Sequence, residues 1–268
     1  MLYVLVVIHN RTCADSIACR SLMSQTSLDF RVLVYDNSDT DLGIKDECAA
    51  NGWTYLGGTG NRGLPAAYNC ALDHLKAENA AGFICIMDDD TEPGNTFCSD
   101  MKAEAEKNAA DILLPVMMNK GRILSPWRER GRRFFRSYEE CASEPAGNIL
   151  AFNSGMLIPL DVFSDYRYNE DLFLDCVDIS FLRDMKRRGI RTAVVPVYCE
   201  QGFSGTERPS REAAMNRFKL YSIDMRTCYR ERDLRCRRVL LKRAAHLAII
   251  YGSLEPFGIL LKREKEDR

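Results

Sequence analysis

The chain has 268 residues, with 37 Lys and Arg against 38 Asp and Glu, which gives a formal net charge of −1. Its composition, 46% hydrophobic and 28% charged, is typical of a folded globular protein and excludes a disordered or collagen-like chain. A chain of this length suits one large α/β domain with an appendage, and it can bury a core without disulfides or structural metals.

Eleven cysteines are spread along the chain without any CxxC pair. Because zinc fingers and ribbons need ligands clustered at short spacing, we expect core thiols here and not metal ligands. Free thiols are typical of a reducing compartment, so the sequence predicts a cytoplasmic protein. The opening apolar run, residues 2–8, lacks the basic flank of a secretory signal, and no stretch reaches the ~18–20 apolar residues of a membrane-spanning helix.

In chain order, the first half alternates short apolar runs with helical patterns, which predicts a sheet built from βαβ units. We expect strands at residues 2–8, 31–35, 53–56, 83–87 and 112–116. We expect helices from Thr12 to about residue 25, up to Ala50, from Pro65 to about residue 80, and over residues 96–108.

The second half is less regular. Residues 119–147 are rich in Arg, Glu and Gly and predict a long irregular excursion, whereas residues 149–158 predict a single strand. A helix is expected over residues 174–188 with Asp175 as its N-cap, followed by a strand over 191–195. Beyond these elements the chain carries 15 Lys and Arg against eight Asp and Glu, which predicts a catalytic domain, residues 1–208, and a basic helical extension, residues 209–268.

Carboxylates stand where predicted strands end or a helix begins: Asp36, the triplet Asp88-Asp89-Asp90, and the pair Asp175 and Asp178. Ligands of open parallel sheets bind at the carboxyl ends of the strands, so acids placed there have a reason to converge. Alternate carboxylates such as Asp88 and Asp90 can share a hard divalent cation with substrate phosphates. Taken singly, the triplet is equally explained as a solvated loop, and the pair as a helix cap with an acidic first turn.

Six segments occur in a characteristic order: 6–11 (VVIHNR), 32–38 (VLVYDNS), 61–64 (NRGL, with Ala67 and Asn69), 86–90 (IMDDD), 153–156 (NSGM), and 170–178 (EDLFLDCVD, with Arg183 and Gly189). In this order they resemble glycosyltransferase family 2, and within it the rhamnosyltransferase-like branch. The resemblance covers roughly residues 2–205. It implies a GT-A fold, a Rossmann-like mixed α/β sheet flanked by helices, and transfer of a sugar from a nucleotide-diphosphate donor with inversion at the anomeric carbon.

The resemblance also implies roles for individual residues. Asp88 and Asp90 would hold Mg²⁺ or Mn²⁺ on the donor diphosphate, and Asp178 would be the general base that takes the proton of an acceptor hydroxyl. The implied donor-binding residues are His9, Asn10, Asp36, Asn37, Asn61, Gly63, Asn69, Asp88 and Asp89. The implied acceptor side consists of Ser154, Gly155 and Asp175.

The implied partners are a dTDP- or UDP-sugar, with rhamnose as the sugar that the branch suggests, and a saccharide or polyprenyl-linked acceptor of surface polysaccharide synthesis. Where the family often has a metal-binding His, this chain reads Cys199-Glu200, which leaves open whether either residue replaces it. The basic extension suits a peripheral contact with the inner face of a membrane or a homodimer contact. Without an aromatic platform it does not predict nucleic-acid binding.

Two other functions stay open. A nucleotidyltransferase would also use paired acids, but it should have a Gly-rich, basic loop after the first strand, which residues 9–12 lack. A catalytically inactive sugar-nucleotide-binding relative is conceivable because of Cys199. Hydrolysis of the donor in the presence of Mn²⁺ separates this relative from an active transferase.

Overall fold

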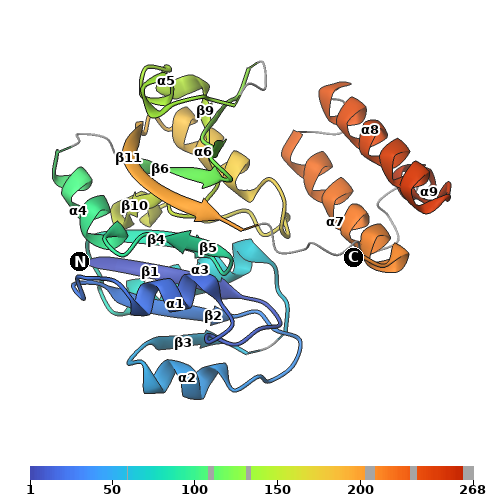
Figure 1. Ribbon diagram of the computed structural model, residues 1–268. Helices are drawn as coiled ribbons and strands as arrows, with labels where there is room; N and C mark the ends of the chain where they lie inside the picture. Colours follow the sequence, from blue (N-terminus) through green and yellow to red (C-terminus); the bar gives the residue numbers. More distant parts are fainter. Residues whose placement is uncertain (59, 108–111, 131–133, 203–208, 230–233, 262–268) are drawn as a thin grey trace. The chain divides into compact units, whose positions relative to one another are not determined.

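The computed structural model describes residues 1–58, 60–107, 112–130, 134–202, 209–229 and 234–261 (Figure 1). The chain forms two compact units. One contains Met1–Tyr168 and Asp178–Ser204, and the other contains Asn169–Val177 and Gly205–Arg268. The short segment Asn169–Val177 therefore groups with the C-terminal helices, although it lies within the first three quarters of the sequence.

The first unit is built on a nine-stranded mixed sheet (Figure 1). Four of its strands lie side by side and parallel, as the βαβ pattern predicts: β3 (Thr54–Gly57), β2 (Arg31–Asp36), β1 (Leu2–Ile8) and β4 (Phe83–Asp88). The order continues with β10 (Leu157–Pro159), β6 (Ile112–Asn119), β11 (Thr192–Gln201) and β5 (Thr91–Pro93), and β7 (Arg122–Ser125) pairs with β6. Because β10 and β5 run antiparallel to their neighbours, the sheet is mixed.

Two predictions for the second half are wrong. The segment 119–147 is not irregular, because it contains β7, β8 (Trp127–Arg128) and the short helix α5 (Tyr138–Ala142). The single strand predicted over 149–158 is two strands: β9 (Ile149–Leu150) pairs with β8 in a separate ribbon, whereas β10 joins the main sheet. The chain turns between them at Gly155, whose φ of 78° lies in the left-handed region that favours glycine.

The helices of this unit are α1 (Ile17–Met23), α2 (Ile44–Ala50), α3 (Leu64–Ala77), α4 (Phe97–Lys107) and α6 (Val177–Arg187). Helix α1 starts later than predicted. Its N-cap is Ser16, whose hydroxyl accepts the N–H of Cys19, whereas Thr12 donates to the carboxylate of Asp15. Short 3₁₀ turns cover Ala146–Asn148 and Leu160–Phe163.

The core lies on both faces of the parallel strands, and every residue of β1 is buried. Alternate residues of β1, including Val4 and Val6, join buried residues of α1, α2 and α4 in one cluster, and α3 covers the other face (Figure 1). All eleven cysteines are free and nine of them are buried, which confirms the prediction of core thiols.

The second unit contains the helices α7 (Arg211–Tyr229), α8 (Leu234–Tyr251) and α9 (Glu255–Leu261). The guanidinium of Arg243 on α8 lies 4.0 Å from the ring centre of Tyr221 on α7. Arg226 on α7 donates to the carbonyl of Leu260 on α9 at 2.7 Å. Among the helices that the structure describes, none has the length and apolar character needed to cross a bilayer.

Candidate functional site

The carboxyl ends of β2, β1 and β4 bring predicted site residues from both halves of the parallel sheet to one edge. Asp36 is paired with Ile8 on one side of β1, and Asp88 is paired with Val7 on the other. The two aspartates are therefore two strand spacings apart, roughly 10 Å between backbones. That span suits the base and the phosphates of one nucleotide.

His9 and Asn10, directly after β1, are tied to the end of β2. Nδ1 of His9 donates to the carbonyl of Asn37 at 2.9 Å, and its Nε2 lies 3.2 Å from the side-chain amide nitrogen of Asn10, which donates to it. Asn10 also donates to Asp39 at 2.8 Å, while its backbone N–H donates to the hydroxyl of Ser38 at 3.0 Å. These bonds fix the first turn of the site.

A second set of bonds joins the end of β2 to the turn before α3. Asn37 donates from Nδ2 to Oδ1 of Asn61 at 2.9 Å, and its own Oδ1 accepts the N–H of Arg62 at 2.8 Å. Oδ1 of Asn61 also accepts the N–H of Gly63 at 3.1 Å. The structure thus places Asn37, Asn61 and Gly63 together, and their role in donor binding stays a prediction.

Asp36 is buried, and both of its carboxylate oxygens accept hydrogen bonds. Oδ1 accepts the N–H of Ser38 at 3.0 Å, and Oδ2 accepts the hydroxyl of Tyr55 at 3.1 Å. Burial, followed by the charge of Asp36, raises the pKa of Tyr55 to about 12. Tyr55, which the sequence did not single out, therefore holds the Asp36 carboxylate in a fixed orientation.

The acidic triplet after β4 is half-buried and crowded. Burial raises the pKa of Asp88 to about 7, and the charges of Asp90, Asp89 and Asp178 add to the shift. Asp89 is paired with Arg11 at 3.1 Å, so its charge already has a partner. Because Asp178 contributes to the shift at Asp88, these two residues lie in the same cluster although they are far apart in sequence.

A continuous chain of hydrogen bonds holds this triplet. The backbone N–H of Asp88 donates to Oγ of Ser154 at 3.0 Å, and Ser154 shares a 2.6 Å bond with Thr91. Thr91 donates to Oε1 of Gln201 at 2.7 Å, and the Gln201 amide donates in turn to Asp90. Thr91, Ser154 and Gln201 are buried. The serine that was expected on the acceptor side thus orients the acidic loop.

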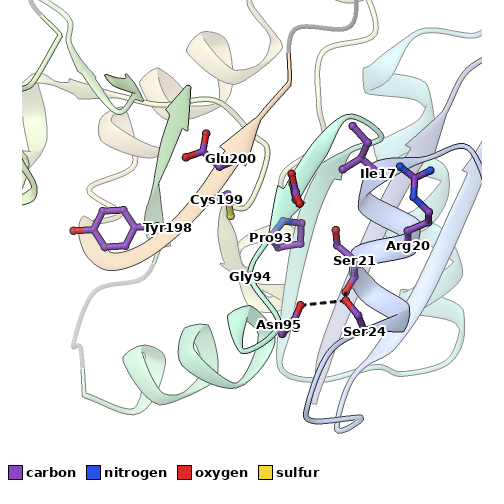
Figure 2. A pocket seen from close by; sticks show the side chains of 11 residues that line it. Ile17, Arg20, Ser21, Ser24, Pro93, Gly94, Asn95, Tyr198, Cys199 and Glu200 are labelled. Atoms are coloured by element: carbon purple, nitrogen blue, oxygen red, sulfur yellow. Dashed lines mark hydrogen bonds between the residues drawn. The ribbon is translucent and has the colours of Figure 1, made fainter. Parts of the chain in front are cut away.

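The positions of Cys199 and Glu200 bear on whether either residue replaces a metal-binding His. The Cys199 thiol belongs to the core cluster, and burial raises its pKa, which keeps it a neutral, poor metal ligand. Glu200 is paired across the strands with Glu92 and lines a pocket of about 560 Å³ between α1 and the β5 and β11 strands (Figure 2). The residue of β11 that reaches the triplet is Gln201.

Near these carboxylates, the hydroxyl of Tyr68 on α3 and Oδ1 of Asn153 are buried. Neither atom forms a hydrogen bond of good geometry with another described residue. Burial raises the pKa of Tyr68, and the charges of Asp88 and Asp178 add to it. Tyr68 therefore shares the surroundings of both carboxylates. Sequence analysis missed it because an aromatic residue on a helix face is indistinguishable from an ordinary core residue.

Two expected site residues have structural tasks. The amide of Asn69 donates to the carbonyl of Tyr168 and accepts its N–H, both at 3.0 Å, so it clamps a backbone segment, and its role in donor binding stays a prediction. The prediction that Asp175 caps a helix is wrong, because α6 starts at Val177 and the Asp175 carboxylate accepts from Arg217 at 2.8 Å. Asp175 lies in the second unit, whereas Asp178 lies in the first.

The donor set around Asp88 and Asp90 suits a divalent cation that shares its coordination with phosphate oxygens. The described residues contain no group of three or more His, Cys, Asp or Glu side chains arranged to enclose a metal. Hard cations of the Mg²⁺ kind, however, are commonly held by one or two carboxylates together with substrate phosphates. Burial and, after it, the charges of Asp90, Asp89 and Asp178 raise the pKa of Asp88, and a bound cation would offset both effects.

The mixed sheet flanked by helices has the GT-A fold found in solved glycosyltransferases. Residues 3–164 match the family described as "Glycosyl transferase family 2". The chain belongs to this family, as the sequence resemblance indicated. No curated protein matches the sequence.

Solved structures of similar fold are glycosyltransferases as well. TarS from S. aureus is 20% identical with a TM-score of 0.55, and the match covers 99% of this chain but 46% of TarS, so the chain spans about half of that protein. TarS residues 1–349 with UDP-GlcNAc give 18% identity and a TM-score of 0.52, covering 99% and 76% of the two chains. The Pyrobaculum calidifontis mannosyltransferase PcManGT, with GDP-Man and Mn²⁺, gives 16% identity and a TM-score of 0.58, covering 97% and 78%.

Proposed function

We propose that this glycosyltransferase is a metal-assisted, inverting enzyme whose general base is Asp178. The observation that carries the proposal is that the charges of Asp90, Asp89 and Asp178 all act on the carboxyl of Asp88 at the end of β4, so these acids lie near one another. A cluster of half-buried carboxylates is costly unless a cation or a proton occupies it. The same cluster would supply both acids that an inverting transfer needs, one for the leaving group and one for the nucleophile.

On the donor side, the carboxylates of Asp88 and Asp90 supply oxygen ligands, and they would hold a Mg²⁺ or Mn²⁺ ion against the diphosphate. When bound, the ion stabilises the negative charge that develops on the departing nucleoside diphosphate. Asp36, Asn37, Asn61 and Gly63 would line the nucleoside end of the pocket. Gln201 and Ser154 orient the triplet and need not contact the donor.

On the acceptor side, Asp178 would accept the proton of a sugar hydroxyl as that oxygen attacks the anomeric carbon. General-base catalysis of this kind contributes about 10²–10⁴-fold. Attack on the face opposite the leaving group inverts the anomeric centre and needs no covalent sugar–enzyme intermediate. One base and one leaving-group stabiliser complete the reaction.

The solved neighbours bind UDP, UDP-GlcNAc or GDP-Man, which supports a nucleotide-sugar donor without selecting one. We keep dTDP-rhamnose as the donor that the sequence resemblance favours, with a saccharide or polyprenyl-linked acceptor at the cytoplasmic side of a membrane. A panel of dTDP-rhamnose, UDP-GlcNAc and GDP-mannose, screened by thermal shift with Mn²⁺, identifies the donor.

The surface of α8 supports a peripheral contact with an anionic membrane. Leu234, Leu241 and Ile249 are 66%, 52% and 83% exposed, and their spacing places them on one helix face together with Arg238 and Lys242. The sequence from 234 to 254 contains no acidic residue. Exposed apolar side chains flanked by cations suit anionic lipid headgroups over acyl chains.

The proposed function is tested with Asp178→Asn and Asp90→Ala. Asp178→Asn should keep Mn²⁺-dependent binding of the donor identified above and lose transfer by about 10²-fold or more. Asp90→Ala should weaken Mn²⁺-dependent donor binding in calorimetry. Asp165→Asn, which removes an exposed carboxylate paired with Arg188, is the control and should change neither. Unchanged transfer in Asp178→Asn, or unchanged affinity in Asp90→Ala, contradicts the respective assignment.

A further inference from the structure

Helix α7 of the second unit holds the segment that leads into α6. The carboxylate of Asp224 is fully buried and accepts three successive backbone N–H groups, those of Phe173, Leu174 and Asp175, at 2.8, 2.9 and 2.7 Å. Isolated burial of a carboxylate is expensive, whereas three N–H donors compensate much of that cost. Asp224 therefore fixes the backbone of residues 173–175 to α7.

A second side chain of α7 grips the same segment. Arg217 donates from both terminal nitrogens to the two oxygens of Asp175, with the Nη2 to Oδ1 distance at 2.8 Å. Arg217 and Asp224 are seven residues apart and so lie on the same face of α7, two turns from each other. A bidentate Arg–carboxylate pair adds orientation as well as energy, because its geometry is planar and fixed.

The next residue, Cys176, is held in an unusual conformation. Its φ is 62°, in the left-handed region that a non-glycine residue occupies only at a cost, and its side chain is buried with Sγ 3.5 Å from Sδ of Met225 on α7. Such a conformation persists where the surroundings enforce it. Val177 then begins α6, and Asp178 stands in its first turn.

We propose that Asp224 and Arg217 are positioning residues for Asp178. By holding residues 173–176, they impose the left-handed turn at Cys176 and thereby set how the chain enters α6, which carries Asp178 two residues later. The inference rests on the proposed function, in which Asp178 is the base. It gives Asp224 and Arg217 a role in transfer in addition to their role in holding residues 173–176.

The first test is Asp224→Asn, which is nearly isosteric but replaces one acceptor oxygen with an NH₂ group that faces N–H donors. Because a small misplacement of a reacting group can cost about 10²-fold, we expect kcat of transfer to fall at least about tenfold. Binding of dTDP, UDP or GDP with Mn²⁺, whichever the donor panel selects, should stay within about twofold in calorimetry, since the donor residues are untouched. Arg217→Lys, a milder change, should lower kcat less.

The second test is rescue. In the Asp224→Asn background, Cys176→Gly should restore part of the lost kcat, because glycine adopts a φ of 62° without the penalty of a side chain. The matched control is Asn79→Gly, which places glycine at another left-handed position, with φ 52°, two residues after the end of α3. It should not restore kcat.

A third readout does not depend on the substrate. Alkylation of Cys176 by iodoacetamide, followed by peptide mass spectrometry, should be at least about tenfold faster in Asp224→Asn than in the wild type, because local opening exposes the thiol. Cys199, which is buried in the core of the first unit, is the internal reference and should keep its wild-type rate.

The outcomes separate this inference from the proposed function. If Asp178→Asn is inactive while Asp224→Asn transfers at the wild-type rate, the positioning role is wrong and the base assignment stands. If Asp178→Asn itself transfers normally, the base assignment fails and the positioning role fails with it. If Asp224→Asn and Arg217→Lys both lose nucleotide binding in step with kcat, the contacts are merely structural and the inference is overturned.

Discussion

The hydroxyl of Ser154 accepts the backbone N–H of Asp88 at 3.0 Å, across 66 residues of sequence. Through Thr91 and Gln201, the same hydroxyl connects to the carboxylate of Asp90. The loop that carries the acidic triplet is thus fixed by the strand segment opposite it and by the end of β11. A rigid loop of this kind presents its carboxylates to a ligand at little further entropic cost.

Ser154→Ala removes this acceptor and leaves the N–H of Asp88 without its partner. We expect a loss of about 1–3 kcal/mol of unfolding free energy and weaker Mn²⁺-dependent nucleotide binding. Ser125→Ala is the matched control, because the buried hydroxyl of Ser125 accepts the N–H of Phe152 at 2.9 Å away from the triplet. It should cost similar stability and leave nucleotide binding intact. Equal binding in the two variants would argue against the orienting role of Ser154.

Gly155→Ala should be much more destabilising than Gly189→Ala. Both glycines have positive φ, 78° and 76°, but an added Cβ at Gly155 would come within 2.7 Å of Cγ of Pro115, whereas Gly189 has open space around it. The conformational penalty is about 1 kcal/mol at either site, and overpacking adds about 1–3 kcal/mol at Gly155 alone. Urea unfolding of the two variants measures the difference, and equal midpoints contradict the crowding at Gly155.

The hydrogen bond between Tyr55 and Asp36 should stabilise the fold in a pH-dependent way. The folded-state pKa of Tyr55 is raised to about 12, above its ordinary value of 10, so the contribution is complete below pH 10 and is lost as pH rises toward 12. The free energy of unfolding of the wild type, minus that of Tyr55→Phe, should be constant from pH 7 to about 9.5 and decline above pH 10. A difference that stays flat up to pH 11 would contradict the raised pKa.

Leu241→Asp should reduce binding of the protein to vesicles containing phosphatidylserine in a flotation assay. The substitution places a negative charge in the exposed apolar face of α8 beside Lys242. Leu28→Asp, at a position in the first unit that is 79% exposed, should bind like the wild type. Binding of the wild type should fall with added salt and should be weak on phosphatidylcholine alone. If the wild type is a dimer that Leu241→Asp dissociates, the face instead contacts a second copy of the chain.

The sequence by itself determined the parallel half of the sheet. Continuous apolar runs such as residues 2–8 can be satisfied only by burial on both faces, and each run ends in polar residues that must then lie at the carboxyl edge. Asp36 and Asp88 were predictable for this reason, since both directly follow or close a buried strand. The order of the six motifs indicated the family, glycosyltransferase family 2, which no single local pattern specifies.

Only the tertiary structure decided which side chains hold the site in place. Gln201, Thr91 and Tyr55 have no local signal, because their roles come from hydrogen bonds to residues distant in sequence. Asp175 and Asp224 show the same limit. In the sequence alone, a carboxylate near the start of a helix, such as Asp175, is interpreted as a cap, and one inside a helix, such as Asp224, as solvated. The structure instead pairs Asp175 with Arg217 and Asp224 with the backbone of residues 173–175. Local patterns encode burial and chain direction, whereas the pairing of buried polar groups depends on which distant segments meet.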